Sequence, residues 1–411
     1  MKLEYLRRNG IMKALLHYSV SAKRKICNGI IRFITKIEQK FPLRDAFIFE
    51  CESDMDDNPR AIYEYMIKEG LNQKYKIIWI VKDVDFCKEN YCNENVCFIS
   101  RFDNSIRNQI RLNYYLATSK WLVFSHPYWF KKKRTEQFVL NTWHGLGMKG
   151  FRKGDSDISD TFDKVLATSP FAMELLSQAW PKNKFEIKEY PRSDFLFNVN
   201  KDKIVKEFFP NYNSGEKVIM CMPTFRQSTY WEDSQIVDRY SLGVVNTDEE
   251  LFALNSFLED HQTYLLVKLH PLQNLALMKS TNLSNIRYVL NREIFERKLL
   301  LYSVLGCCDA LLTDVSSVYI DYLVLNRPIG FFMDNFWDFE RGYIVSNPLD
   351  YMPGEKISNL NDLYIFIDNL SAGKDNYAEE RNKVCKLFHA HSNQDNGKRV
   401  LEWLVKEEVK K

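Results

Sequence analysis

The chain has 411 residues, of which 45% are hydrophobic and 14% aromatic, and its net charge is +3. This composition excludes a largely disordered protein, and the length predicts two domains, because one core usually stops growing near about 250–300 residues. No apolar stretch approaches the roughly 18 residues of a spanning helix, and no signal peptide is evident. The nine cysteines follow no metal-binding or disulfide pattern, which predicts a reducing, cytosolic compartment.

The first forty residues carry the excess positive charge. Their balance is +8, which leaves −5 for residues 41–411. Between residues 26 and 37, apolar side chains recur with the period of one helical face. We therefore predict that residues 1–42 form a basic amphipathic segment on an anionic membrane surface; the alternative is a helix packed on its own domain. Nucleic acid is not an expected partner, because the segment has no groove-reading motif.

Short strands alternate with helical patterns in the remaining chain, which predicts mostly parallel sheets covered by helices on both faces. A polar stretch at 198–217 separates two such series, so we expect an α/β fold of two Rossmann-like domains that face a central cleft. The helical patterns are clearest at 60–69 and 170–179. The predicted strands are 46–49, 76–81, 121–124, 138–143, 165–168, 218–222, 264–269, 310–312 and 329–332.

Polar residues follow four of these strands, at the point where each strand ends. The carboxyl ends of parallel strands line the binding crevice of an open α/β sheet, so we expect these residues to share one pocket. They are His144-Gly145, Pro223-Thr224-Phe225-Arg226, Lys268-Leu269-His270-Pro271 and Thr313-Asp314-Val315-Ser316-Ser317.

The residue types in this pocket suit transfer from a nucleotide diphosphate, which needs mainly alignment and neutralisation of charge. His144 could accept a proton from a hydroxyl near neutral pH, and Gly145 would allow close approach of a ligand. Lys268 and His270 lie two positions apart on an extended segment and would reach one ligand together.

Residues 313–317 offer hydroxyls and N–H groups at a helix start, and Arg226 adds a guanidinium suited to phosphate oxygens. Each candidate also has a plainer interpretation. A structural histidine, the end of a surface strand, a helix cap and a surface ion pair would account for His144, Lys268, Asp314 and Arg226 respectively.

The chain resembles the CDP-glycerol or CDP-ribitol glycerophosphotransferases of teichoic-acid and capsule synthesis. The likeness rests on motifs whose order and spacing agree over about residues 45–370. These are Asp57-Asn58-Pro59-Arg60, Trp143-His144-Gly145 with Lys149, Tyr190-Pro191-Arg192-Ser193-Asp194, Pro223-Thr224-Phe225-Arg226, Lys268-Leu269-His270-Pro271, and Thr313-Asp314-Val315-Ser316-Ser317 through Asp321-Tyr322 to Arg327-Pro328.

The resemblance implies a glycosyltransferase B fold and transfer of an alditol phosphate from CDP-glycerol or CDP-ribitol to a hydroxyl, with release of CMP. It implies an acceptor domain at 43–200, a CDP-donor domain at 201–385 and a C-terminal helix in 386–411. His144, as the base, and His270 would be catalytic. Other donor-binding residues would be Thr224, Arg226, Lys268, Thr313, Asp314, Ser316, Ser317 and Asp321; the acceptor side would include Gly145, Lys149, Arg192 and Asp194.

The resemblance also implies the partners and the location. The acceptor would be lipid-linked or a polysaccharide, and the enzyme would lie peripherally on the inner face of the bacterial cell membrane. We expect no cofactor, and no acidic cluster calls for a divalent cation.

Two positions depart from the family pattern. Leu146 stands where the family usually has threonine, and Glu189 stands where it has glycine. Loss of the hydroxyl near the proposed base would alter acceptor choice. Two other hypotheses remain: a nucleotide-sugar glycosyltransferase of the same fold, and a non-catalytic peripheral protein of an envelope assembly complex.

Overall fold

The computed structural model describes residues 40–126, 134–151, 155–224, 240–268, 283–334, 336 and 342–407. Most of the predicted N-terminal membrane segment, together with Arg226 and His270, lies outside the described residues. Within them, no helix is both long and apolar enough to cross a membrane.

The first half of the chain forms a parallel sheet with the strand order β3-β2-β1-β4-β5-β6-β7. Its central strands are apolar and mostly buried, as expected of parallel strands covered on both faces, whereas the edge strands β3 and β7 are partly exposed. The bounds are β1 Arg44–Glu50, β2 Lys76–Val81, β3 Val96–Ser100, β4 Ser119–Phe124, β5 Phe138–Asn141, β6 Lys164–Ala167 and β7 Phe185–Ile187.

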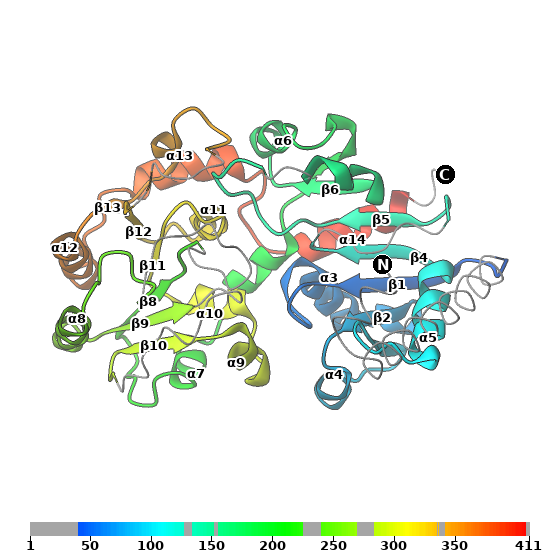
Figure 1. Cartoon of the computed structure of the whole chain (residues 1–411), viewed down its shortest axis with the longest axis horizontal. Helices are drawn as coiled ribbons and strands as arrows, with labels where there is room; N and C mark the ends of the chain where they lie inside the picture. The colour runs from blue at the N-terminus through cyan, green and yellow to red at the C-terminus, as the bar shows by residue number, and fades with distance from the viewer. Residues whose placement is uncertain are drawn as a thin grey trace, which may run out of the picture.

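The second half forms another parallel sheet, with the order β10-β9-β8-β11-β12-β13. Figure 1 shows the two sheets side by side, the first on the right and the second on the left. The predicted fold of two Rossmann-like α/β domains is thus confirmed. The bounds are β8 Lys217–Cys221, β9 Thr263–Lys268, β10 Ile286–Val289, β11 Ala310–Thr313, β12 Ile329–Phe332 and β13 Glu355–Ile357.

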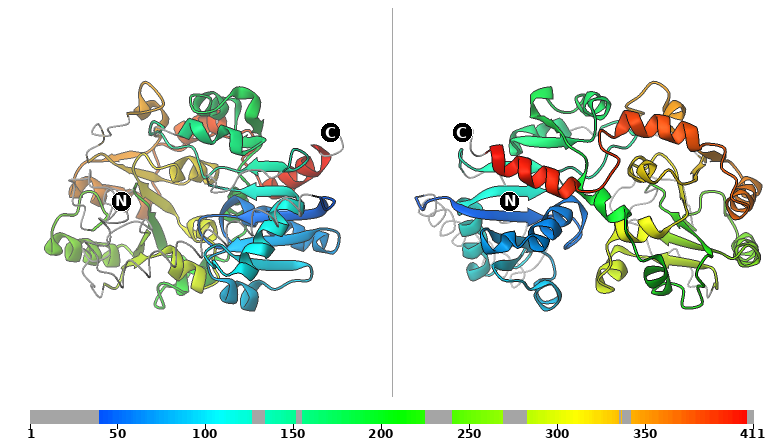
Figure 2. Two further views of the ribbon diagram at one scale, coloured as in Figure 1. Left: turned by 45° about the vertical axis from the view of Figure 1, so that its right-hand side comes forward. Right: turned by 180° about the vertical axis from the view of Figure 1, so that it is seen from behind.

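Helices flank both sheets (Figure 2). Local signals fix several of their ends: α8 begins with a capping box between Thr247 and Glu250, and α6 begins at Pro170 behind the capping hydroxyl of Ser169. The bounds are α3 Asp57–Lys68, α4 Val84–Tyr91, α5 Ile106–Thr118, α6 Pro170–Leu176, α7 Lys201–Lys206, α8 Asp248–Asp260, α9 Asn291–Glu296, α10 Leu301–Cys307, α11 Val318–Tyr322, α12 Leu360–Ser371, α13 Ala378–Phe388 and α14 Asn396–Glu407.

The C-terminal helix α14 returns to the first half of the chain. It packs against α3 and against η4, a 3₁₀ helix at Pro191–Leu196. The right-hand view of Figure 2 shows this red helix across the first domain. The two halves are therefore joined both by the segment before β8 and by the segment that leads into α14. The domain boundaries themselves stay a prediction.

Candidate active site

His144 follows β5 on a loop with an unusual backbone conformation. Trp143 has φ +57° and Gly145 has φ +120°, both in the left-handed region. A non-glycine residue there costs on the order of 1–3 kcal/mol and persists only where its surroundings hold it. Here Asn58 Nδ2 donates to the Trp143 carbonyl at 2.9 Å, and Arg192 Nη2 donates to the His144 carbonyl at 3.0 Å. Two side chains thus fix the loop that carries His144.

The His144 ring is oriented by a backbone carbonyl. Its Nδ1 lies 3.3 Å from Ser125 O, so Nδ1 carries the proton and Nε2 keeps its lone pair. Burial, assisted by the positive charge that His126 can carry, lowers the pKa of His144 to about 3. The imidazole is therefore neutral near pH 7, the form in which it can take a proton from a hydroxyl.

A second histidine lies directly beside this ring. The imidazoles of His126 and His144 stack with centroids 4.6 Å apart and planes 7° apart, and His126 Nδ1 is 3.0 Å from Ser125 Oγ. Burial lowers the pKa of His126, and the carboxylates of Asp57 and Glu52 oppose this. Sequence reasoning missed His126, although a His-Pro pair just after a strand is the same signal as the one at His270-Pro271.

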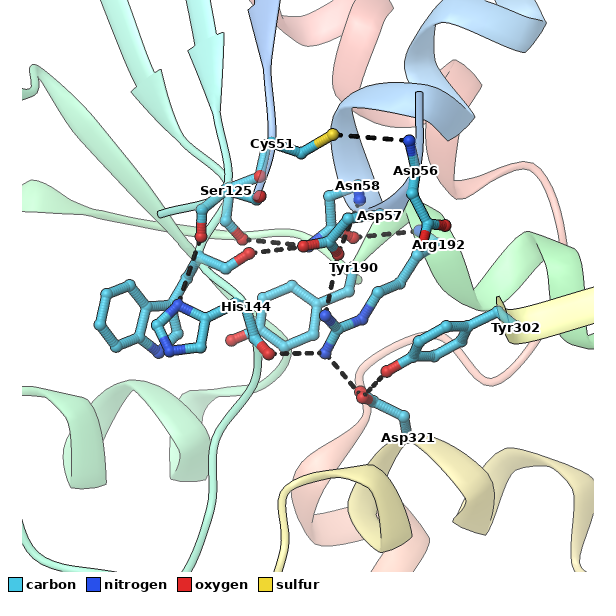
Figure 3. A network of polar contacts seen from close by, with 12 residues as sticks. Cys51, Asp56, Asp57, Asn58, Ser125, His144, Tyr190, Arg192, Tyr302 and Asp321 are labelled. Carbon is cyan, nitrogen blue, oxygen red and sulfur yellow. Dashed lines mark hydrogen bonds and ion pairs between the residues drawn. The ribbon is translucent and has the colours of Figure 1, made fainter. Parts of the chain in front are cut away.

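Arg192 lies at the centre of a buried polar network (Figure 3). Its Nη1 donates to Asp57 at 2.9 Å and its Nη2 to Asp321 at 2.7 Å. Tyr302 donates to the same Asp321 oxygen at 2.5 Å, and its ring lies 4.8 Å from the guanidinium. Burial alone would raise the pKa of Asp57, but Arg192 outweighs this and lowers it. The network joins the two domains next to His144.

The predicted site residues Arg192 and Asp321 are thus brought together, with 4% and 2% of their surfaces exposed. Their charged groups pair with each other and with Asp57 and Tyr302, and the buried Nε of Arg192 has no hydrogen-bond partner among the described residues. The geometry places them behind the loop of His144, where they would act by holding it. Direct contact of either residue with a substrate stays a prediction.

In the second domain, Asp314 braces two strand ends. It accepts hydrogen bonds from Thr224 N at 2.9 Å, Thr224 Oγ1 at 2.5 Å and Ser316 N at 3.1 Å. Thr313 Oγ1 adds a bond to the carbonyl of Met222 at 2.8 Å. The ends of β8 and β11 are therefore tied together, and the half-buried Ser316 and Ser317 follow at the start of α11.

The loop of His144 packs on this serine pair. A Cβ added to Gly145 would lie 2.8 Å from Arg192 Nη2 and 2.9 Å from Ser317 Oγ. One added to Gly147 would lie 3.6 Å from both Ser317 N and Val315 O. Close packing between the domains therefore favours glycine at position 145, in addition to any close approach of a ligand. The loop of the candidate base in one domain thus contacts Ser317, a candidate phosphate ligand of the other, and a pocket shared by all four strand ends stays a prediction.

Lys268, at the end of β9, is a buried cation. It forms no hydrogen bond or salt bridge with another described residue, and burial lowers its pKa to about 8. Asp56, in the loop before α3, is the carboxylate whose charge opposes this shift, and burial raises the pKa of Asp56 to about 6. Lys268 is therefore available to an anion near neutral pH.

Two predicted acceptor-side residues have structural partners. Asp194 accepts hydrogen bonds from Asn396 N and Gly397 N, both at 2.9 Å, at the start of α14. Lys149 pairs through its backbone with Tyr343 in an isolated antiparallel bridge. Asp194 thus holds the returning C-terminal helix, and Lys149 belongs to a second contact between the halves of the chain.

The two departures from the family pattern are both buried. Leu146 is in the core. Glu189 accepts a hydrogen bond from His389 Nδ1 at 3.0 Å, and His389 Nε2 lies 2.8 Å from the carbonyl of Ile320. Burial lowers the pKa of His389, but Glu189 outweighs it and raises the value to about 9. A charged partner thus compensates for the carboxylate at the glycine position.

Among the described residues, no three His, Cys, Asp or Glu side chains are placed so that they could hold a metal ion.

The sequence profile of one family, CDP-glycerol:poly(glycerophosphate) glycerophosphotransferase, matches residues 34–406. The chain is 27% identical over 332 residues to a teichoic acid poly(glycerol phosphate) polymerase of Bacillus spizizenii, covering 72% of this chain and 78% of that protein. It is 25% identical over 407 residues to a teichoic acid glycerol-phosphate transferase of Staphylococcus aureus, covering 90% and 96%. A structure of the wall teichoic acid polymerase TagF superposes with a TM-score of 0.74 at 20% identity, covering 96% of this chain and 98% of that one.

Proposed function

Because the chain belongs to the CDP-glycerol:poly(glycerophosphate) glycerophosphotransferase family, we propose that it transfers glycerol phosphate from CDP-glycerol to an acceptor hydroxyl in teichoic-acid-type polymer synthesis. Glycerol is favoured over ribitol because the matched family and the two relatives above carry glycerol phosphate in their names. The ribitol-phosphate enzymes among the relatives are 23–24% identical over 59–86% of this chain.

One observation carries the chemical assignment: the neutral imidazole of His144 lies on a fixed loop that packs against Ser317 of the other domain. Its Nε2 would take the proton of the acceptor hydroxyl as that oxygen bonds to the phosphorus next to glycerol. The anhydride bond then breaks, and its electron pair leaves with CMP. The reaction needs alignment and charge neutralisation more than covalent help.

The donor phosphates would lie at the strand ends of the second domain. Lys268 is a buried cation without a hydrogen-bonded partner among the described residues, and Ser317 places its hydroxyl against the loop that carries the base. The side chains of Asp314 and Thr313 form the hydrogen bonds that tie the ends of β8 and β11 together, so they would shape this site. Arg226 and His270 stay predicted donor ligands.

The donor assignment is tested with purified full-length enzyme, CDP-glycerol, CDP-ribitol and a panel of UDP- and CMP-sugars, with and without lipid-linked acceptor. We expect CMP release from CDP-glycerol and its loss in Lys268→Met. If the enzyme prefers CDP-ribitol, the transferred group is ribitol phosphate and not glycerol phosphate. Release of UDP, or of CMP from a CMP-sugar alone, would favour the glycosyltransferase hypothesis.

We further propose that the enzyme works at the inner face of the bacterial membrane and that residues 1–42 bind anionic lipid. The support is the +8 charge of the first forty residues. Flotation of the full chain with vesicles of phosphatidylglycerol tests this. Binding should weaken with salt and in a Lys23→Glu, Arg24→Glu, Lys25→Glu variant; equal flotation with neutral vesicles would contradict it.

A further inference from the structure

The imidazole rings of His126 and His144 lie side by side next to Ser125. Both rings approach Ser125 through Nδ1, at 3.0 Å and 3.3 Å, and their planes differ by only 7°. Nε2 of each ring is therefore directed away from Ser125. No other described residue forms a hydrogen bond with either Nε2.

The Nε2 of His126 can bind a hydroxyl in either tautomer. If Ser125 Oγ accepts from Nδ1, then Nε2 is an acceptor; if Oγ donates, then Nε2 is a donor. A hydroxyl group can both donate and accept a hydrogen bond, so it can bind Nε2 in either case. His126 can therefore form a second contact with a hydroxyl beside the base, whichever of its two ring nitrogens carries the proton.

The charges around His126 favour a neutral ligand over an anion. The carboxylates of Asp57 and Glu52 reach it, and so do the cations Arg192 and Arg101. Both cations are already paired, Arg192 with Asp57 and Asp321, and Arg101 with Glu50 and Glu52 at 3.3 and 3.6 Å. Among the described residues, a phosphate beside His126 would meet these carboxylates without an unpaired cation, whereas an uncharged hydroxyl would not be repelled.

The first domain also has a cavity toward which the rest of an acceptor would extend. This cavity, of about 1070 Å³, starts at Glu52, whose charge reaches His126, and extends along the carboxyl ends of β1, β2 and β3 to α9 of the second domain.

We propose that His126 is a specificity-determining residue that, together with His144, binds two hydroxyls on neighbouring carbons at the end of the acceptor. His144 takes the proton of the reacting hydroxyl, and His126 holds the hydroxyl next to it. Hydrogen bonds of about 2.8 Å let two adjacent oxygens bridge rings that are 4.6 Å apart. The preferred acceptor therefore ends in a vicinal diol. This inference rests on the proposed function, because it takes His144 as the base.

Two synthetic acceptors that differ by one hydroxyl test the proposal. Octyl phosphoglycerol ends in a vicinal diol, and the octyl phosphate ester of 1,3-propanediol ends in a single hydroxyl. With full-length enzyme and labelled CDP-glycerol, we expect kcat/KM to favour the diol about tenfold, the size of one well-placed hydrogen bond. His126→Ala should lower kcat/KM for the diol about tenfold and for the single hydroxyl far less.

Two matched variants separate binding from a structural role. His126→Asn can keep the contact with Ser125 but has no group at Nε2, so it should lose the preference for the diol. His126→Gln places an amide near Nε2 and should keep part of it. An equal loss with both acceptors in His126→Ala, or no preference in the wild-type enzyme, would overturn the proposal.

A measurement without turnover covers the case in which octyl acceptors react poorly. In protein labelled with ¹⁵N-histidine, octyl phosphoglycerol should shift the Nε2 resonances of both His126 and His144, and the single-hydroxyl compound only that of His144. An unmoved His126 would refute the diol site. Failure of the wild-type enzyme to release CMP from CDP-glycerol would instead refute the proposed function, so the two outcomes are distinguishable.

Discussion

The strand ends of the two domains meet at the candidate site, but they are built differently. In the first domain, the loop of His144 is held by Asn58 and by Arg192, whose guanidinium is itself fixed by two carboxylates. In the second, Asp314 braces the strands while Lys268 and the serine pair stay available. In the proposed function, the first domain would position the base in advance, whereas the second would supply groups that a charged donor can engage.

The largest effect should follow loss of the buried guanidinium. Arg192→Met would leave Asp57 and Asp321 as buried carboxylates without their cation, so we expect a loss of about 3–5 kcal/mol in the free energy of unfolding and collapse of activity. Chemical denaturation and CMP release measure the two. Lys182→Ala, which breaks an exposed pair with Glu174, is the control and should leave both unchanged. Equal stability of the two variants would contradict the central role of Arg192.

The buried pair of Glu189 and His389 should make stability depend on pH. The pKa of His389 rises from about 6.5 to about 9 on folding. Because the folded-state pKa is the higher one, the stabilisation is complete below pH 6.5 and is lost as the pH rises through 9. We expect the free energy of unfolding to fall by a few kcal/mol over this range. In His389→Gln this fall should disappear; an unchanged pH profile would argue against the charged pair.

A methyl group added at Gly145, where the two domains touch, should lower kcat and have a smaller effect on stability. Gly145→Ala places a Cβ 2.8 Å from Arg192 Nη2 and 2.9 Å from Ser317 Oγ, at a φ of +120°. We expect a loss of about 1–3 kcal/mol in stability and a fall in kcat as His144 is displaced. Gly215→Ala has a comparable positive φ of +99° but open space around it. It serves as the control, with kcat unchanged.

Binding of the donor by the second domain should depend on the charge of Lys268. Lys268 has a pKa of about 8 in the free enzyme, so it loses its charge as the pH rises through that value. Because kcat/KM reports the free enzyme, we expect kcat/KM for CDP-glycerol to fall by about tenfold per unit above pH 8. Lys268→Arg should move the fall to higher pH. A profile that is flat to pH 9.5 in the wild type would remove Lys268 from the donor site.

The sequence predicts the central strands well and misses the outer ones. The four unpredicted strands are β3, β7, β10 and β13, and these are the two edges of each sheet. Central parallel strands are buried on both faces and show as continuous apolar runs. Edge strands have one neighbour and more exposed residues, so their pattern is weaker.

The candidate site is also predicted only in part from the sequence. The sequence predicts which strand ends meet, because polar residues interrupt apolar runs at 144, 224, 268 and 313. It does not show that Arg192 pairs with Asp321, or that Tyr302 supports them, since these contacts join residues more than a hundred positions apart or lie outside any motif. The stacked His126 also depends on the positions of two strand ends in space.

The most direct test of the central claim is CMP release from CDP-glycerol by the wild-type enzyme and His144→Ala, measured on protein whose unfolding curves coincide. We predict a loss of turnover of about 100-fold or more in the variant, because the base would be missing from an otherwise intact site. Equal turnover by the two proteins would contradict the assignment of His144 and, with it, the account of a base positioned across the domain contact.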